Sequence, residues 1–124
     1  MKPIIKSGGD AAEYYFREGC FITELSNDAD DPSVSIARAR VEPGKTTRWH
    51  HLIDTVERYV ILSGEGLAEI GDEPPRAVGA GDVIIIPALC RQRISNIGND
   101  NLIFLAICSP RFFSENYRDI ESEI

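Results

Sequence analysis

The pattern of hydrophobic and polar positions predicts a series of short β-strands from residue 33 onward. Segments in which apolar and polar residues alternate, or in which a few apolar residues follow one another, are separated by Gly, Pro, Asn and Asp. Strands that recur about every 8–12 residues, with turn residues between them, are typical of an all-β sandwich or barrel. The predicted strands are VSIARARV (34–41), ERYVIL (57–62), GLAEIG (66–71), VIIIP (83–87), RQRISN (91–96) and NLIFLAIC (101–108).

The two ends of the chain give weaker signals. We expect residues 1–30 to form an N-terminal extension that contains either an edge strand or a short helix. Residues 31–109 are predicted to form the barrel, and residues 110–124 a C-terminal tail that contains one helical turn. A length of 124 residues suits a single domain.

Composition narrows the class of protein. A hydrophobic content of 43% and a mean hydropathy of -0.16 suit a globular protein. The net charge of -7 argues against nucleic acid or an anionic membrane as a partner, because both attract basic proteins. The longest apolar runs are much shorter than the roughly 20 residues that span a bilayer. Because the N-terminus has no apolar signal segment and the three cysteines form no CxxC pair, we expect a cytoplasmic protein with reduced thiols.

Alternation also sorts the side chains between the two faces of each strand. The two histidines of the chain, His50 and His51, are neighbours, so they point to opposite faces and we expect one of them to reach the interior. His50 shares its face with Leu52. Polar residues that share a face with apolar neighbours in the later strands are Glu57 and Tyr59, and then Gln92 and Asn96.

The spacing of these residues resembles the two sequence motifs of the cupin superfamily. The first motif places a glycine, a histidine, a glutamate and a second glycine at fixed intervals, and the second motif contains a Gly-x5-Pro turn and ends on an asparagine. The resemblance implies a double-stranded β-helix, that is, a jelly-roll barrel with a pocket inside, in a single domain. The matching residues are Gly44, His50, Glu57 and Gly64 in the first motif, and Gly81, Pro87 and Asn96 in the second.

Three departures from the motifs change the metal site that the resemblance implies. Leu52 stands where many cupins have a second histidine, Gln92 stands at the histidine position of the second motif, and Leu89 replaces a glycine. The ligands implied for this chain are therefore His50, Glu57 and Gln92, around a divalent ion such as Fe, Mn, Zn or Ni. Because an amide oxygen is uncharged, we expect weaker metal binding than with a third histidine.

Two other interpretations of the same residues stay open. Without a metal, His50 and Glu57 would hydrogen-bond each other, with Gln92 bridging, and would act as a general acid and base. Alternatively, the three residues form a purely structural polar cluster. Tyr59 would either donate its hydroxyl to a ligand or pack as an ordinary core tyrosine.

The resemblance implies a protein that binds a small molecule, and most directly a metal-dependent enzyme acting on a carbohydrate-like or carboxylated metabolite. The sequence is similar to small cupins of the mannose-6-phosphate isomerase-like pattern. This pattern does not select a reaction, because isomerase, dioxygenase and lyase chemistry all occur on this fold. The alternatives are a metal-free acid/base isomerase that uses His50 and Glu57, and a non-catalytic ligand-binding or sensing module. We also expect a homodimer, because small cupins often pair through edge strands and unpaired edges are prone to association.

Overall fold

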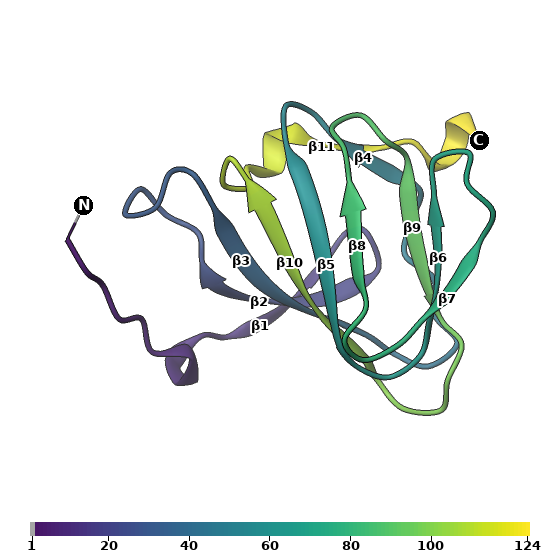
Figure 1. The fold of residues 1–124 in the computed structure, drawn as a ribbon, viewed down its shortest axis with the longest axis horizontal. Coiled ribbons are helices and arrows are strands. Elements are labelled where there is room, and N and C mark those ends of the chain that lie inside the picture. Colours follow the sequence, from purple (N-terminus) through teal and green to yellow (C-terminus); the bar gives the residue numbers. More distant parts are fainter. Residues whose placement is uncertain (1) are drawn as a thin grey trace.

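The computed structural model describes residues 2–124, whose strands form two antiparallel sheets (Figure 1). The six-stranded sheet has the order β1 (Glu13–Phe16), β2 (Cys20–Ser26), β3 (Ser35–Val41), β10 (Leu102–Ser109), β5 (Val56–Ser63) and β8 (Val83–Ile86). The five-stranded sheet has the order β11 (Tyr117–Asp119), β4 (His50–Leu52), β9 (Gln92–Asn96), β6 (Gly66–Ile70) and β7 (Arg76–Val78). The 3-10 turns are η1 (Gly8–Asp10), η2 (Ser114–Asn116) and η3 (Glu121–Glu123).

The predicted all-β double-stranded β-helix is confirmed. Each of the six predicted strands is present, and its ends lie within one residue of the expected positions. The sequence did not predict β7 and β11, because a strand of three residues is too short to show an alternating pattern. None of the helical turns within residues 2–124 is long or apolar enough to cross a membrane.

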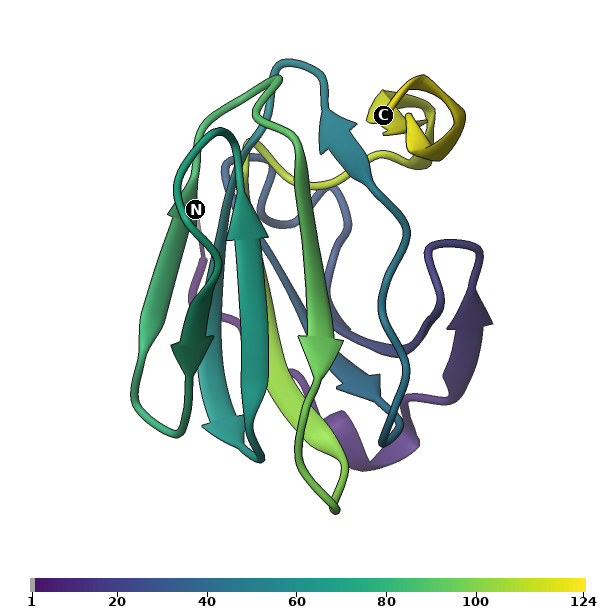
Figure 2. The same cartoon turned by 90° about the vertical axis from the view of Figure 1, so that its right-hand side faces the viewer.

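Both ends of the chain contribute strands. The described part of the predicted N-terminal extension, residues 2–30, contains strand rather than α-helix: β1 is the edge strand of the six-stranded sheet, and β2 lies between β1 and β3. In the C-terminal segment, β11 pairs with β4 and so extends the five-stranded sheet. Figure 2 shows this segment, in yellow, lying beside β4.

The size of the inward-facing side chains on β3 and β10 differs between the two ends of the barrel. At one end of the β3–β10 pair, Val41 faces Leu102, and both side chains are fully buried. At the other end the inward positions carry small side chains, with Ala37 opposite Ala106. Ser35 stands opposite Cys108 in the same ladder. Large side chains therefore fill one end of the barrel, and the small ones leave space at the other.

The motif glycines occupy turns that need their backbone freedom. Gly64 has a φ of 89°, and a Cβ placed there would lie 2.6 Å from the carbonyl oxygen of Asn101. Only glycine fits such a left-handed turn pressed against a neighbouring backbone. Leu89, at the position where the motif has glycine, keeps a left-handed φ of 66°. Its backbone N–H donates to the carbonyl of Leu52 at 2.8 Å, which ties the turn to the strand of His50.

Candidate active site

A cavity of about 50 Å³ lies at the end of the barrel where β3 and β10 carry small side chains. This volume exceeds the roughly 10–15 Å³ that one water molecule needs, but it lies below the roughly 300–1,000 Å³ of most ligand pockets, so the cavity accommodates one group of a ligand rather than a whole sugar or nucleoside. Aromatic rings form much of its wall, together with Ala37, Ala39 and Ala106. The polar and titratable side chains that line the cavity are Tyr14, Glu18, Glu24, Ser35, His50, Glu57, Tyr59, Cys108 and Tyr117.

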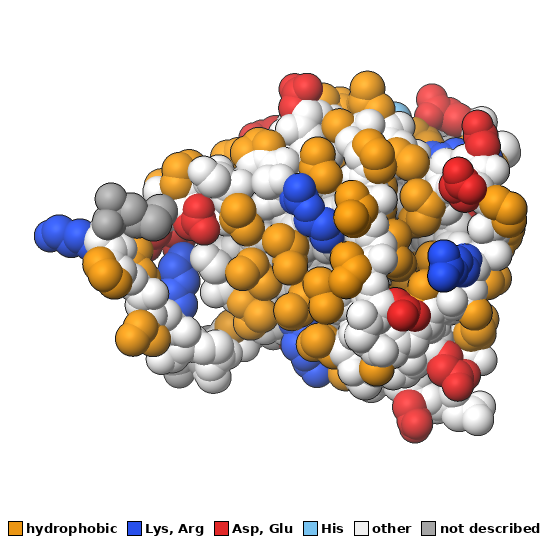
Figure 3. All heavy atoms as spheres, viewed as in Figure 1, with side chains coloured by type: hydrophobic (Ala, Val, Ile, Leu, Met, Phe, Trp, Pro, Cys, Tyr) orange, Lys and Arg blue, Asp and Glu red, His pale blue; other side chains and the backbone are white. Residues whose placement is uncertain are grey.

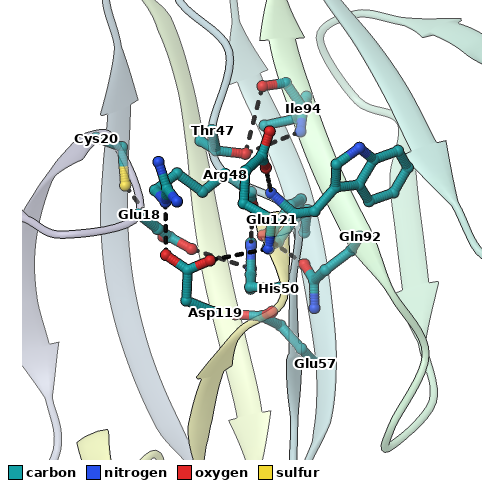
Figure 4. A network of polar contacts seen from close by, with 12 residues as sticks. Glu18, Cys20, Thr47, Arg48, His50, Glu57, Gln92, Ile94, Asp119 and Glu121 are labelled. Atoms are coloured by element: carbon teal, nitrogen blue, oxygen red, sulfur yellow. Dashed lines mark hydrogen bonds and ion pairs between the residues drawn. The ribbon is translucent and has the colours of Figure 1, made fainter. Parts of the chain in front are cut away.

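His50 and Glu18 form a buried ion pair at this cavity. The Nε2 atom of His50 lies 3.0 Å from Oε2 of Glu18, and the His50 side chain is 2% exposed. Figure 4 shows the two side chains pointing toward one another from β4 and from the turn between β1 and β2. The thiol of Cys20 donates to the other Glu18 oxygen at 3.1 Å. Glu18 is thus fixed by two donors from two different strands.

Both ring nitrogens of His50 face acceptors. Nδ1 lies 2.6 Å from the carbonyl oxygen of Arg48, which only accepts hydrogen bonds, so Nδ1 carries a proton. Burial alone would lower the pKa of His50, but the charge and hydrogen bond of Glu18 outweigh it and raise that pKa to about 9. The same pairing outweighs the effect of burial on Glu18 and holds its pKa below the ordinary value. The site therefore contains a fixed imidazolium–carboxylate pair at neutral pH.

Glu57 is the second buried carboxyl group of the cavity. Its Oε2 atom accepts a weak hydrogen bond from the thiol of Cys108 at 3.7 Å, whereas Oε1 is buried and has no partner in the part of the chain that the structure describes. Burial, and then the charge of Glu18, raise the pKa of Glu57 to about 7, although His50 acts in the opposite direction. Two carboxyl groups in one site, Glu18 and Glu57, thus have pKa values displaced in opposite directions, a pattern typical of acid/base sites.

Tyr59 and Gln92 are joined by a buried hydrogen bond. The Tyr59 hydroxyl donates to Oε1 of Gln92 at 2.7 Å, so it already has an acceptor within the protein. The Tyr59 ring packs on Phe104 with a centroid distance of 4.3 Å. Gln92 lies directly opposite His50 in the β4–β9 ladder. This pair fixes the wall of the cavity beside the imidazole.

Tyr117 brings the C-terminal segment into the site. Its ring stacks on the imidazole of His50 with a centroid distance of 5.1 Å and an interplanar angle of 26°. Its hydroxyl is buried and has no hydrogen-bond partner within residues 2–124. Arg48 and Asp119 form an ion pair at 2.5 Å that holds β11 against the residues before β4 (Figure 4). Tyr117 therefore has a fixed place over His50, and its hydroxyl is unused.

Comparison with known proteins identifies the family. Residues 37–108, more than half of the chain, match the family model described as Cupin domain. This chain belongs to the cupin family. A comparison with curated proteins gave no significant match.

Solved structures share the fold of this cupin. Pac13, described as a unique nucleoside dehydratase, superposes with a TM-score of 0.79 and 18% identity, over 97% of this chain and 92% of Pac13. KdgF from Halomonas sp. has a TM-score of 0.76 and 14% identity, over 92% of this chain and 99% of KdgF. Oxalate decarboxylase from Lactobacillus farciminis has a TM-score of 0.75 and 21% identity, over 90% of this chain and 34% of that enzyme.

The barrel of this cupin brings three of the four predicted site residues to the wall of one cavity, while changing the contacts between them. His50, Glu57 and Tyr59 line the cavity, and Gln92 is buried beside His50. The hydrogen bond expected between His50 and Glu57 does not occur, because Glu18 occupies the Nε2 side of the ring. Glu18 was missed because it lies in a turn outside both motifs, where no periodic pattern reports its direction.

The residues implied as metal ligands do not fit a divalent ion in their present contacts. A ligating imidazole needs a free nitrogen lone pair, and both nitrogens of His50 face protein acceptors. The Gln92 amide oxygen accepts from Tyr59, and Leu52 offers no donor atom. Within residues 2–124, no three His, Cys, Asp or Glu side chains are arranged to hold a metal ion. Metal binding through His50, Glu57 and Gln92 therefore stays a prediction, and it requires these contacts to break.

Proposed function

We propose that this cupin is a metal-independent acid/base enzyme of the isomerase or lyase type, acting on a small molecule bound in the barrel. The observation that carries the proposal is Glu57: a buried carboxyl group with an unpartnered oxygen at the cavity and a pKa raised to about 7. A group with such a pKa is present in both protonation states near neutral pH. It can therefore accept a proton in one step and return it in the next.

Glu57 is the proton-transfer group of the proposed mechanism. Ionised Glu57 takes a proton from a substrate carbon next to a carbonyl group, and the electron pair of that C–H bond moves into the carbonyl to give an enolate. In an isomerisation, the hydroxyl proton of the carbon that lost its hydrogen passes to the enolate oxygen, and protonated Glu57 returns its proton to the former carbonyl carbon, so that the carbonyl group moves by one carbon. In an elimination, it gives the proton to a departing hydroxyl group, which leaves as water. Both routes balance without an oxidant or a reductant.

His50 and Glu18 supply the electrostatic setting of the proposed reaction. Because both N–H groups of His50 are donated to protein acceptors, the imidazolium acts as a fixed positive charge rather than as the acid that meets the substrate. That charge favours the ionised form of Glu57, although the charge of Glu18 acts more strongly in the opposite direction. Tyr59 positions Gln92, and Tyr117 covers the imidazole.

The structural neighbours support this chemical class without selecting a substrate. Pac13 is described as a nucleoside dehydratase, and removal of water is a lyase reaction that needs proton transfer. Tyr-to-Phe and His-to-Gln variants of Streptomyces Pac13 have been solved with uridine. For this reason we choose nucleosides and simple sugars, with their aldehyde and keto forms, as the first compounds to test.

The test is exchange or turnover in the presence of EDTA. Carbonyl forms of sugars and nucleosides are incubated with the protein in D₂O, and NMR follows deuterium incorporation next to the carbonyl and any loss of water. We expect EDTA-insensitive turnover that Glu57→Gln lowers by at least about 10²-fold, while the control variant His51→Gln keeps it. Turnover that EDTA abolishes would contradict the proposal. Binding without turnover would favour a sensing module.

A metal-dependent enzyme is the second candidate, favoured by the free oxygen of Glu57. The ion would need His50 to release Glu18 and Gln92 to release Tyr59. Elemental analysis of protein purified without chelator, followed by titration with Fe, Mn, Zn and Ni, tests this candidate. Equimolar binding that His50→Ala abolishes would support it.

A further inference from the structure

The charged side chains at the cavity are acidic, apart from the imidazolium of His50. Glu18, Glu24 and Glu57 line it, and within residues 2–124 no lysine or arginine does. Phosphate and carboxylate ligands are normally held by arginine or lysine, or by free N–H groups. His50 offers no free N–H group to an anion, because one of its N–H groups is donated to Glu18 and the other to the Arg48 carbonyl.

Arg17 lies beside the cavity wall but makes its contacts with the C-terminal segment. Its guanidinium carbon lies 4.7 Å from the ring centroid of Tyr117, and one of its nitrogens donates to the carbonyl of Ser114 at 3.1 Å. It therefore holds the C-terminal segment in place rather than facing the cavity. An anion that entered would meet these carboxylates, and the imidazolium of His50 beside them is already paired with Glu18.

Two buried polar atoms at the cavity lack partners among residues 2–124: Oε1 of Glu57 and the hydroxyl of Tyr117. Buried polar groups in native proteins are nearly always hydrogen-bonded, so such a pair indicates where a ligand or an ordered water binds. A carboxylate oxygen accepts, and a tyrosine hydroxyl both donates and accepts. Aromatic rings, including Phe16, Phe112 and Tyr117, form the adjoining wall. The complementary group is a hydroxyl or carbonyl on a ligand with an apolar face.

We propose that the cavity selects an uncharged ligand that carries hydroxyl or carbonyl groups, bound through the Tyr117 hydroxyl and Oε1 of Glu57, and rejects phosphorylated and carboxylated analogues. The inference rests on the proposed function only in placing the substrate at this cavity. It narrows the expected substrates to neutral, carbohydrate-like compounds and makes Tyr117 a specificity-determining residue.

The first experiment compares matched neutral and anionic probes. Uridine is paired with uridine 5′-monophosphate, and glucose is paired with glucose 6-phosphate and with glucuronate. Thermal shift and calorimetry measure binding of each probe to the intact protein. We expect a neutral member to bind, and its anionic partner to bind at least about tenfold more weakly. Equal or tighter binding of the anion overturns the inference, and so does a panel in which no neutral probe binds.

The second experiment separates Tyr117 from an ordinary structural tyrosine. Tyr117→Phe removes a buried hydroxyl that has no partner, so we expect the melting temperature of the free protein to stay the same or to rise. The same variant should bind the neutral probe about five- to tenfold more weakly. Tyr59→Phe is the matched control, and it should lower the melting temperature because it leaves Gln92 unpaired. Wild-type affinity in Tyr117→Phe, or a loss of stability equal to that of Tyr59→Phe, overturns the inference.

The two proposals fail in different ways. Neutral binding without turnover would leave the ligand class standing and would remove the enzymatic role. Turnover of a phosphorylated or carboxylated compound that depends on Glu57 would leave the enzymatic role standing and would remove the ligand class.

Discussion

The imidazole of His50 and the carboxylate of Glu18 form an ion pair in which neither partner is freely exposed, since their side chains are 2% and 13% accessible. The two residues come from different elements, β4 and the turn between β1 and β2. A pair of this kind costs desolvation when it forms and is strongly destabilising when one partner is removed. It therefore determines both the charge of the site and the position of the N-terminal hairpin.

The first prediction concerns the charge of His50. Its pKa is raised to about 9, so the imidazole should stay protonated across neutral pH and lose its proton near pH 9. NMR of the two histidine side chains measures this directly, with His51→Ala to assign the signals. Glu18→Gln should lower the pKa of His50, because it removes the carboxylate charge that most strongly opposes the effect of burial. An unchanged midpoint in Glu18→Gln would show that the pair does not form in solution.

The second prediction concerns stability and Glu57. Its pKa is about 7 in the folded protein and near 4.5 when unfolded, so the folded state binds more protons between these values. The contribution of Glu57 to stability should therefore fall as the pH rises from about 4.5 to 7. At pH 8, Glu57→Gln should raise the free energy of unfolding by on the order of 2 kcal/mol, with little change at pH 4.

Urea unfolding at several pH values checks the Glu57 prediction. Glu42→Gln is the matched control, because Glu42 is exposed and carries the same chemical change on the surface. A Glu57→Gln variant that is destabilised equally at pH 4 and pH 8 would contradict the raised pKa. It would indicate instead a hydrogen bond that the amide cannot replace.

The third prediction compares how much stability is lost when each of two motif glycines is replaced by alanine. Gly64 and Gly44 both have positive φ angles, of 89° and 76°, but a Cβ would strike the backbone of Asn101 only at Gly64. Gly64→Ala should lower the free energy of unfolding by about 2–4 kcal/mol, and Gly44→Ala by about 1 kcal/mol. Chemical denaturation measures both variants. Equal losses would mean that the left-handed backbone alone, rather than the close contact, requires glycine at position 64.

The fourth prediction concerns the homodimer expected from the sequence. Three apolar side chains are exposed on the outer face of β5 and β8, namely Leu62 at 46%, Val83 at 58% and Ile85 at 66%, and Figure 3 shows hydrophobic side chains gathered over this part of the six-stranded sheet. The strand β8 also has an unpaired edge. Antiparallel pairing of β8 with a second copy satisfies twofold symmetry, which makes a second copy the partner that we expect.

Light scattering after size-exclusion chromatography checks the dimer. We expect twice the 13.8 kDa mass of the chain, and a shift toward the monomer in Ile85→Lys. Ile5→Lys is the control, because Ile5 is also exposed but lies before β1. A monomer at micromolar concentration in the wild-type protein would contradict the prediction.

The local pattern predicted the strands well because alternation is a property of neighbouring residues. The faces assigned to Glu57 and Gln92 were correct: both residues are buried, and the residues on either side of them are less buried. His50 faces inward, while its neighbour His51 is only partly buried. The short strands β7 and β11 were not predicted. Their extended conformation depends on pairing with β6 and β4 rather than on a pattern in their own residues.

The periodicity of the sequence determined the strands and the residues that share a face. The resemblance of its spacing to the cupin motifs then implied the barrel, its motif turns and the inward direction of His50, Glu57 and Gln92. Only the tertiary structure decided which groups meet. Glu18 reaches His50 from a turn 32 residues earlier, and Tyr117 reaches it from a strand 67 residues later. Burial and the charges of these distant residues then set the pKa values of the site, and no local pattern in the chain records such contacts.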